Sequence, residues 1–115
     1  MIVAPLSILG VWEEEFQKFA AFPYALAVLS GSSAKKLDTL RHMIGTALQV
    51  VVVNYESAWR LEKALTAWHP DLIIADEGHK IKTHNIAASK AMHRMSREAS
   101  YRLLLTGTVI TNKAI

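Results

Sequence analysis

The clearest strand in the sequence is the β-branched block Gln49-Val50-Val51-Val52-Val53. An unbroken apolar run of this kind is typical of a strand covered on both faces, because a strand with one face in water alternates apolar and polar residues. Such strands belong to parallel sheets, whose crossover connections are usually helices. The block therefore favours an α/β fold with three layers, a mainly parallel sheet with helices on both faces.

Outward from this block, short apolar runs alternate with helical patterns, as expected for a chain of crossover units. Further strands are predicted at residues 1–4, 25–29, 72–75 and 101–105. Ser7 is placed to cap the first helix, and Pro70 is expected to stop the third. Apolar spacing gives the helices these buried faces: Ile8, Trp12, Phe16 and Phe19; Leu37, Leu40 and Ile44; Ala58, Leu61, Leu65 and Trp68; Met92 and Met95. Neither a repeat nor a linker interrupts residues 1–115, so we expect a single domain.

The composition limits the classes of function. With 115 residues and 51% hydrophobic residues the chain can bury a core, and its net charge of +3 permits contact with a polyanion without requiring it. The sequence contains no cysteine, which excludes disulfides and thiolate metal sites and makes a reducing, cytoplasmic compartment the natural expectation. No apolar run approaches the ~20 residues of a membrane span, and no membrane association is expected.

The acidic pair Asp76-Glu77 directly follows the apolar run 72–75. Open parallel sheets bind ligands beyond the carboxyl ends of their strands, which is where these two carboxylates are placed. One carboxylate can hold the magnesium ion of a nucleotide while the next orients or deprotonates the attacking water. The alternative from these residues alone is a solvated acidic turn.

The pair begins the stretch Asp76-Glu77-Gly78-His79, which resembles motif II of superfamily 2 helicases in the spelling of Swi/Snf-type DNA-dependent ATPases. Three other segments resemble motifs of the same family in the expected order: residues 1–19 motif Ia, residues 51–56 motif Ib, and residues 102–108 with Asn112 motif III. The resemblance implies part of the N-terminal RecA-like lobe of a helicase-type ATPase. Such a motor uses ATP and magnesium to move on DNA, which we expect to be double-stranded.

The resemblance also implies roles for individual residues. Asp76 would hold magnesium through water, and Glu77 would polarise the hydrolytic water. His79 is expected to be catalytic together with Asp76 and Glu77, and to link the nucleotide site to the nucleic acid. The other residues expected to couple the two sites are Thr106, Gly107 and Thr108. Those expected to contact the nucleic acid are Pro5, Leu6, Ser7, Asn54 and Tyr55. By the same resemblance, the full protein would be associated with DNA, in the nucleoid or elsewhere in the cytoplasm.

The sequence departs from the family pattern in two ways. It contains no G-x-x-x-x-G-K-[ST] segment, the Walker A loop that cradles the nucleotide phosphates. Val109 stands where the family usually has proline, which loosens the expected placement of Thr106 and Thr108. We therefore expect a piece cut at both ends, which would need the Walker A segment and a second motor lobe as partners and would be inactive alone. The alternative is an inactive lobe that binds DNA or protein, and exposed strand edges make self-association plausible.

Three other groups of residues have ordinary structural interpretations. The basic residues Lys80, Lys82, Lys90, Arg94 and Arg97 fit a solvated surface better than a binding patch. The tryptophans Trp12, Trp59 and Trp68 fit core packing better than base stacking. The histidines His69, His79, His84 and His93 lack the paired spacing of zinc motifs, so no zinc site is expected.

Overall fold

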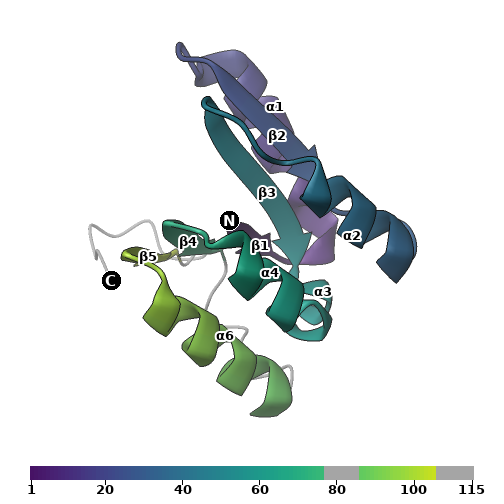
Figure 1. The fold of residues 1–115 in the computed structure, drawn as a ribbon. Helices are drawn as coiled ribbons and strands as arrows, with labels where there is room; N and C mark the ends of the chain where they lie inside the picture. The colour runs from purple at the N-terminus through teal and green to yellow at the C-terminus, as the bar shows by residue number, and fades with distance from the viewer. Residues whose placement is uncertain (77–85, 106–115) are drawn as a thin grey trace.

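The structure, a computed structural model, describes residues 1–76 and 86–105. Five parallel strands form one sheet in the order β2-β3-β1-β4-β5 (Figure 1). The shortest strand, β1 (Ile2–Ala4), lies at the centre, between β3 (Leu48–Asn54) and β4 (Leu72–Ala75). The edges are β2 (Tyr24–Val28) and β5 (Tyr101–Leu104). The predicted α/β class with a parallel sheet is confirmed.

Helices cover both faces of the sheet. The described helical segments are η1 (Leu6–Ile8), α1 (Leu9–Phe19), α2 (Ser33–Arg41), α3 (Tyr55–Arg60), α4 (Glu62–Trp68) and α6 (Ile86–Glu98). Helix α1 packs on one face, whereas α2, α3, α4 and α6 contribute to the core on the other face. Within the described ranges, no helix is long and apolar enough to cross a membrane.

Strand β3 confirms the interpretation of the valine block. Val51 and Val53 belong to the core cluster beneath the four helices, while Val50 and Val52 belong to the cluster beneath α1. None of these four side chains is more than 6% exposed. Alternation along a strand sends neighbouring side chains to opposite faces, so both layers need apolar residues here.

The predicted first helix does end at Phe19, but the predicted cap at Ser7 and the predicted burial of Phe19 were wrong. Ser7 lies inside η1, and α1 begins at Leu9 after Ile8, which makes no side-chain cap. Phe19 is 75% exposed. It is the last residue of α1, and the sheet face beneath that helix is already covered by Ile8, Trp12 and Phe16.

The predicted second and third helices had the correct general position but wrong extents. Ile44 is 76% exposed because α2 ends at Arg41, so the helical spacing no longer applies to it. The predicted continuous helix over 58–68 is two helices that meet at Leu61, whose φ of −103° and ψ of 21° are not helical. Its apolar residues nevertheless face the core as predicted. Helix α4 ends at Trp68, and the C-cap residue His69 adopts a left-handed φ of 57° directly before Pro70.

Truncation of Leu65 should strongly destabilise the fold. This side chain is 0% exposed and lies in the core beneath α4. We expect Leu65→Ala to lower the free energy of unfolding by about 2–5 kcal/mol, through lost apolar burial and a residual cavity. Leu6→Ala, at a leucine that is 72% exposed, is the matched control, and we expect a change within about 0.5 kcal/mol. Urea unfolding followed by circular dichroism measures both; equal effects would contradict the described packing.

A chain that starts at Met1 should become more stable as the pH rises from 6 to 8. Its amino group donates to the Leu72 carbonyl oxygen at 2.8 Å. Burial lowers the pKa of this amine from 8.0 to about 6, and Asp71 only partly opposes the effect. Because the folded pKa lies below the unfolded one, the folded state releases this proton first. The resulting gain in stability is complete above pH 8 and is lost as the pH falls through 6.

The expected gain is about 2–3 kcal/mol in the free energy of unfolding, the equivalent of a shift of roughly two pKa units. Urea unfolding at several pH values between 5.5 and 8.5 measures it. The matched control is the same chain with an acetylated amino terminus, which keeps an N–H donor but cannot be charged. An identical pH dependence in the two chains would contradict this origin.

Candidate functional site

The predicted site residues that follow three of the strands lie together at the end of the sheet where the carboxyl ends of its strands meet. In the parallel register, Ala4 pairs with Asn54 and Val3 pairs with Ala75. The carboxyl ends of β3, β1 and β4 therefore lie side by side, and Pro5, Asn54 and Asp76 line this edge. The topology thus confirms that Asp76 comes at the carboxyl end of a strand next to the sheet centre.

Asp76 is held by three hydrogen bonds from three different elements. Its backbone N–H donates to the Val3 carbonyl oxygen at 2.8 Å, which continues the pairing of β4 with β1. The indole Nε1–H of Trp12 donates to Asp76 Oδ2 at 2.9 Å. The hydroxyl of Tyr55 donates to the Asp76 carbonyl oxygen at 2.6 Å. Both the backbone and the carboxylate of Asp76 are therefore fixed.

The chemistry of this carboxylate fits magnesium. Mg²⁺ prefers oxygen ligands and is usually bound through one or two carboxylates, water and the phosphates of the substrate. An ionised carboxylate offers about four acceptor positions, of which the described contacts to Trp12 use one. Among residues 1–76 and 86–105, no cluster of three His, Cys, Asp or Glu side chains forms a protein-only metal cage. Within these ranges, Asp76 is the residue that would hold the ion together with water and the phosphates of the substrate.

The other predicted catalytic and coupling residues lie outside the described part of the chain. These are Glu77, His79, Thr106, Gly107 and Thr108. The described chain approaches the same edge at Leu105, whose N–H donates to the Ala75 carbonyl oxygen at 2.9 Å. The carboxyl end of strand β5 therefore lies next to the end of β4, which Asp76 follows.

The residues predicted to contact nucleic acid differ in exposure. Pro5 connects β1 to η1, and Leu6 and Ser7, the first two residues of η1, are exposed. Asn54 is half-buried and caps α3, its Oδ1 accepting from the Ser57 N–H at 3.3 Å. Tyr55 is only 2% exposed, so its side chain faces Asp76 in the interior and not the surface.

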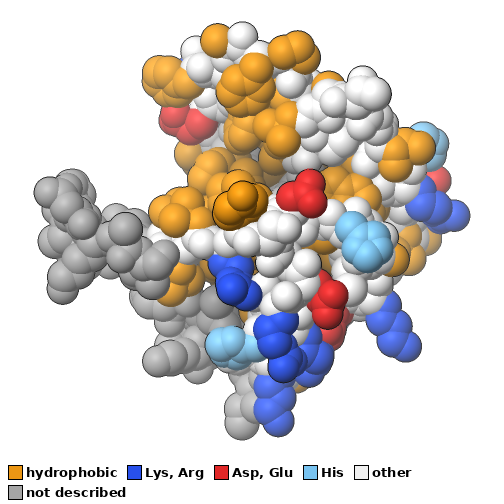
Figure 2. Space-filling model, turned by 60° about the vertical axis from the view of Figure 1, so that its left-hand side comes forward, with side chains coloured by type: hydrophobic (Ala, Val, Ile, Leu, Met, Phe, Trp, Pro, Cys, Tyr) orange, Lys and Arg blue, Asp and Glu red, His pale blue; other side chains and the backbone are white. Residues whose placement is uncertain are grey.

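Basic side chains gather on the lower part of the face seen in Figure 2, at the height of α6 in Figure 1. Helix α6 carries Lys90, Arg94 and Arg97, all exposed. Arg94 forms a two-pronged pair with Glu62 of α4, with N–O distances of 2.7 and 2.6 Å. This hydrogen bonding lowers the pKa of Glu62 below its usual value. Arg94 thus ties two helices together, in agreement with an ordinary structural role.

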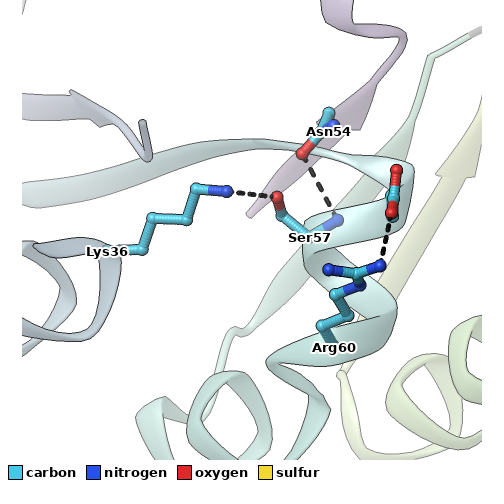
Figure 3. A network of polar contacts seen from close by, with 5 residues as sticks. Lys36, Asn54, Ser57 and Arg60 are labelled. Atoms are coloured by element: carbon cyan, nitrogen blue, oxygen red, sulfur yellow. Dashed lines mark hydrogen bonds and ion pairs between the residues drawn. The ribbon is translucent and has the colours of Figure 1, made fainter. Parts of the chain in front are cut away.

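A polar cavity of about 320 Å³ opens beside the carboxyl ends of β2 and β3. Lys36 of α2 reaches across it and donates from Nζ to the Ser57 hydroxyl at 2.7 Å (Figure 3). Arg60 pairs with Glu56 at 2.7 Å, and both side chains are more than half exposed. Lys36, Arg60 and Glu56 together give the lining of this cavity a net charge of +1. An oxyanion such as a phosphate suits such a cavity.

Sequence reasoning missed four of these residues. Trp12 was assigned only to the core, where its ring does pack beneath α1, while its N–H serves Asp76. Lys36, Ser57 and Arg60 were not singled out. A signal existed for Lys36, because it comes shortly after the turn 30–33, which closes a predicted strand. No local pattern marks the other three.

Comparison with known proteins agrees with this geometry. The model of the SNF2-related domain family matches residues 1–115, the whole chain. The chain is 33% identical over 112 residues to the ISWI chromatin-remodeling complex ATPase CHR11 of Arabidopsis thaliana, covering 97% of this chain and 10% of that protein. It is 34% identical over 115 residues to the ATP-dependent helicase brm of Drosophila melanogaster, covering 98% and 7% respectively.

A third relative is the TATA-binding protein-associated factor MOT1 of Saccharomyces cerevisiae, 33% identical over 115 residues, with 100% of this chain and 6% of that protein covered. The chain thus spans a tenth or less of the length of these three relatives. The match over all 115 residues nevertheless includes every strand of the sheet and the edge that holds Asp76. The chain belongs to the SNF2-related domain family.

Proposed function

We propose that the protein containing this chain is a motor that hydrolyses ATP to move along DNA, and that residues 1–115 form part of its first RecA-like lobe. The observation that carries the proposal is the fixed carboxylate of Asp76 at the carboxyl end of β4. The family supports it, because the names of two relatives include "ATPase" and "ATP-dependent helicase".

Each acid of the pair has its own task in this proposal. Asp76 would hold the magnesium ion, through water, and Glu77, the next residue, would orient and deprotonate the water that attacks the γ-phosphate. When bound, the magnesium ion neutralises charge on the phosphate oxygens. The hydrogen bonds from Trp12 and Tyr55 keep Asp76 in one orientation before the nucleotide arrives. Because the carboxylate is already oriented, no free energy is needed to order it during the reaction.

The same edge of the sheet provides contacts for a DNA backbone, which we propose to be double-stranded. Leu6 and Ser7 are exposed there, after the half-buried Pro5, and Asn54 lines the polar cavity with Lys36 and Arg60. Hydroxyl, amide and cationic groups bind phosphates without reading the base sequence. A motor that moves along DNA requires contacts of this kind.

The coupling residues complete the proposal. His79, Thr106, Gly107 and Thr108 would relay the state of the nucleotide to the DNA, as the resemblance of their segments to motifs II and III implies. The Walker A segment and the second motor lobe would come from other parts of the full protein. That protein would act where DNA is, in the nucleoid or elsewhere in the cytoplasm.

Removal of either acid should impair hydrolysis by the full protein. We expect Glu77→Gln to lower the DNA-stimulated ATPase rate about 10²–10⁴-fold, the usual contribution of a general base, and Asp76→Asn to raise the magnesium requirement. Glu98→Gln, at an exposed acid in the last turn of α6, is the control and should leave the rate unchanged. An ATPase rate that neither DNA nor Glu77→Gln alters would refute the proposed function.

The isolated 115-residue chain should not hydrolyse ATP. Its sequence contains no Walker A loop to hold the β- and γ-phosphates, so binding would depend on magnesium contacts alone. Phosphate release by the purified chain measures this. Turnover that persists through purification and disappears in Asp76→Asn would contradict the expectation.

A second candidate function is a module that binds DNA without hydrolysis, and the polar cavity favours it because Lys36 and Arg60 need no nucleotide. We expect the 115-residue chain to bind DNA at low salt. Lys36→Gln should reduce the slope of log affinity against log salt by about one. Lys18→Gln, in the last turn of α1 and so at the opposite edge of the sheet, should change it less. Fluorescence anisotropy with a labelled duplex measures the affinity. Equal slopes in the two variants would show that the cavity does not bind DNA.

A further inference from the structure

We infer that Trp12 is a positioning residue for the magnesium-holding carboxylate, acting through its indole hydrogen bond to Asp76. The inference rests on the proposed function and adds to it a residue that lies 64 positions away in the chain. Trp12 touches neither nucleotide nor metal in this scheme. It acts by fixing the carboxylate that does.

The indole of Trp12 is itself held in place. It lies on the second turn of α1, and its ring packs against the cluster formed by Ile2, Ala4 and Val52 on that face of the sheet. An indole N–H is a donor only and has no second hydrogen-bonding mode. It therefore ties one carboxylate oxygen of Asp76, Oδ2, to α1.

Tyr55 supplies the complementary anchor. Its hydroxyl holds the backbone carbonyl of Asp76 at 2.6 Å, while Trp12 holds the side chain at 2.9 Å. Both anchors belong to helical segments that follow a segment proposed to contact DNA: α1 follows Pro5-Leu6-Ser7, and α3 follows Asn54. A displacement of either segment therefore reaches the magnesium ligand through a single side chain. Ligands positioned by outer hydrogen bonds usually lose metal affinity when those bonds are removed.

The alternative is that this hydrogen bond only satisfies a partly buried indole N–H and has no effect on magnesium binding. Trp68 provides a matched comparison for this alternative. Its indole is also partly buried, and it donates to a backbone carbonyl oxygen, that of Met43, at 2.8 Å. Both tryptophans are partly buried and each donates an indole hydrogen bond, but Trp12 bonds to the Asp76 carboxylate, whereas Trp68 bonds to a backbone carbonyl oxygen.

The test compares Trp12→Phe with Trp68→Phe in the full protein. Each change removes one indole donor and keeps an aromatic ring. A fluorescent ADP analogue is titrated with Mg²⁺ and, separately, in excess EDTA, and the Mg²⁺ concentration for half-maximal ATPase is measured. We expect Trp12→Phe to lower the magnesium-dependent gain in nucleotide affinity by about threefold to tenfold, at or below the range for outer ligands of metals bound directly by protein. Affinity in EDTA should not change, and Trp68→Phe should match the wild type.

The Asp76→Asn background adds a readout that a purely structural role would not produce. Trp12→Phe should have no further effect on magnesium dependence there. If Trp12→Phe fails to fold, benzothienylalanine at position 12 replaces only the N–H by sulfur in the same ring shape and permits the same measurements.

Two results would overturn the inference while leaving the proposed function intact: a wild-type magnesium dependence in Trp12→Phe, or equal losses in Trp12→Phe and Trp68→Phe. A wild-type protein whose nucleotide binding and hydrolysis are independent of Mg²⁺ would overturn the proposed function, and this inference with it.

Discussion

The pairing of β1 between β3 and β4 is the constraint on which the rest of the structure depends. This strand has only three residues, yet Val3 and Ala4 are 0% exposed, and Val53, the partner of Val3 in β3, is also 0% exposed. Backbone groups without access to water must find partners in the sheet. A shift of one residue would also send apolar side chains to the wrong layer. The register of the centre is therefore fixed, and with it the positions of Pro5, Asn54 and Asp76.

This centre also determines how the two layers of helices reach the site. Because the strands are parallel, the segments after them start from one edge, and the side chains of their first turns remain near it. Trp12 approaches Asp76 from the face covered by α1, and Tyr55 belongs to the core on the opposite face. A residue at the end of β4 is thereby held from both sides of the sheet. Neither layer alone could fix both its carboxylate and its backbone.

The sequence predicted what depends on neighbouring residues and missed what depends on distant ones. Strand β4 has the predicted bounds, and Leu65, Met92 and Met95 are buried as their spacing indicated. Phe19 and Ile44 were misplaced because their burial depends on where a helix stops, which tertiary packing decides. The placement of Asp76 followed from its position after an apolar strand. Its bond to Trp12 joins residues 64 positions apart, and no local pattern encodes such a contact.

The short helix α3 connects the two parts of the candidate site. It has six residues, of which Tyr55, Ser57 and Ala58 are buried. Tyr55 donates toward Asp76, and Ser57 accepts from Lys36 in the polar cavity. A helix with half of its residues in a packed core does not deform gradually, because close-packed interiors pass a displacement on to their neighbours. An anion that draws Lys36 away from Ser57 would thus act on the same rigid turn that holds Asp76. Lys36, Ser57 and Tyr55 therefore link the polar cavity to Asp76 within the described part of the chain.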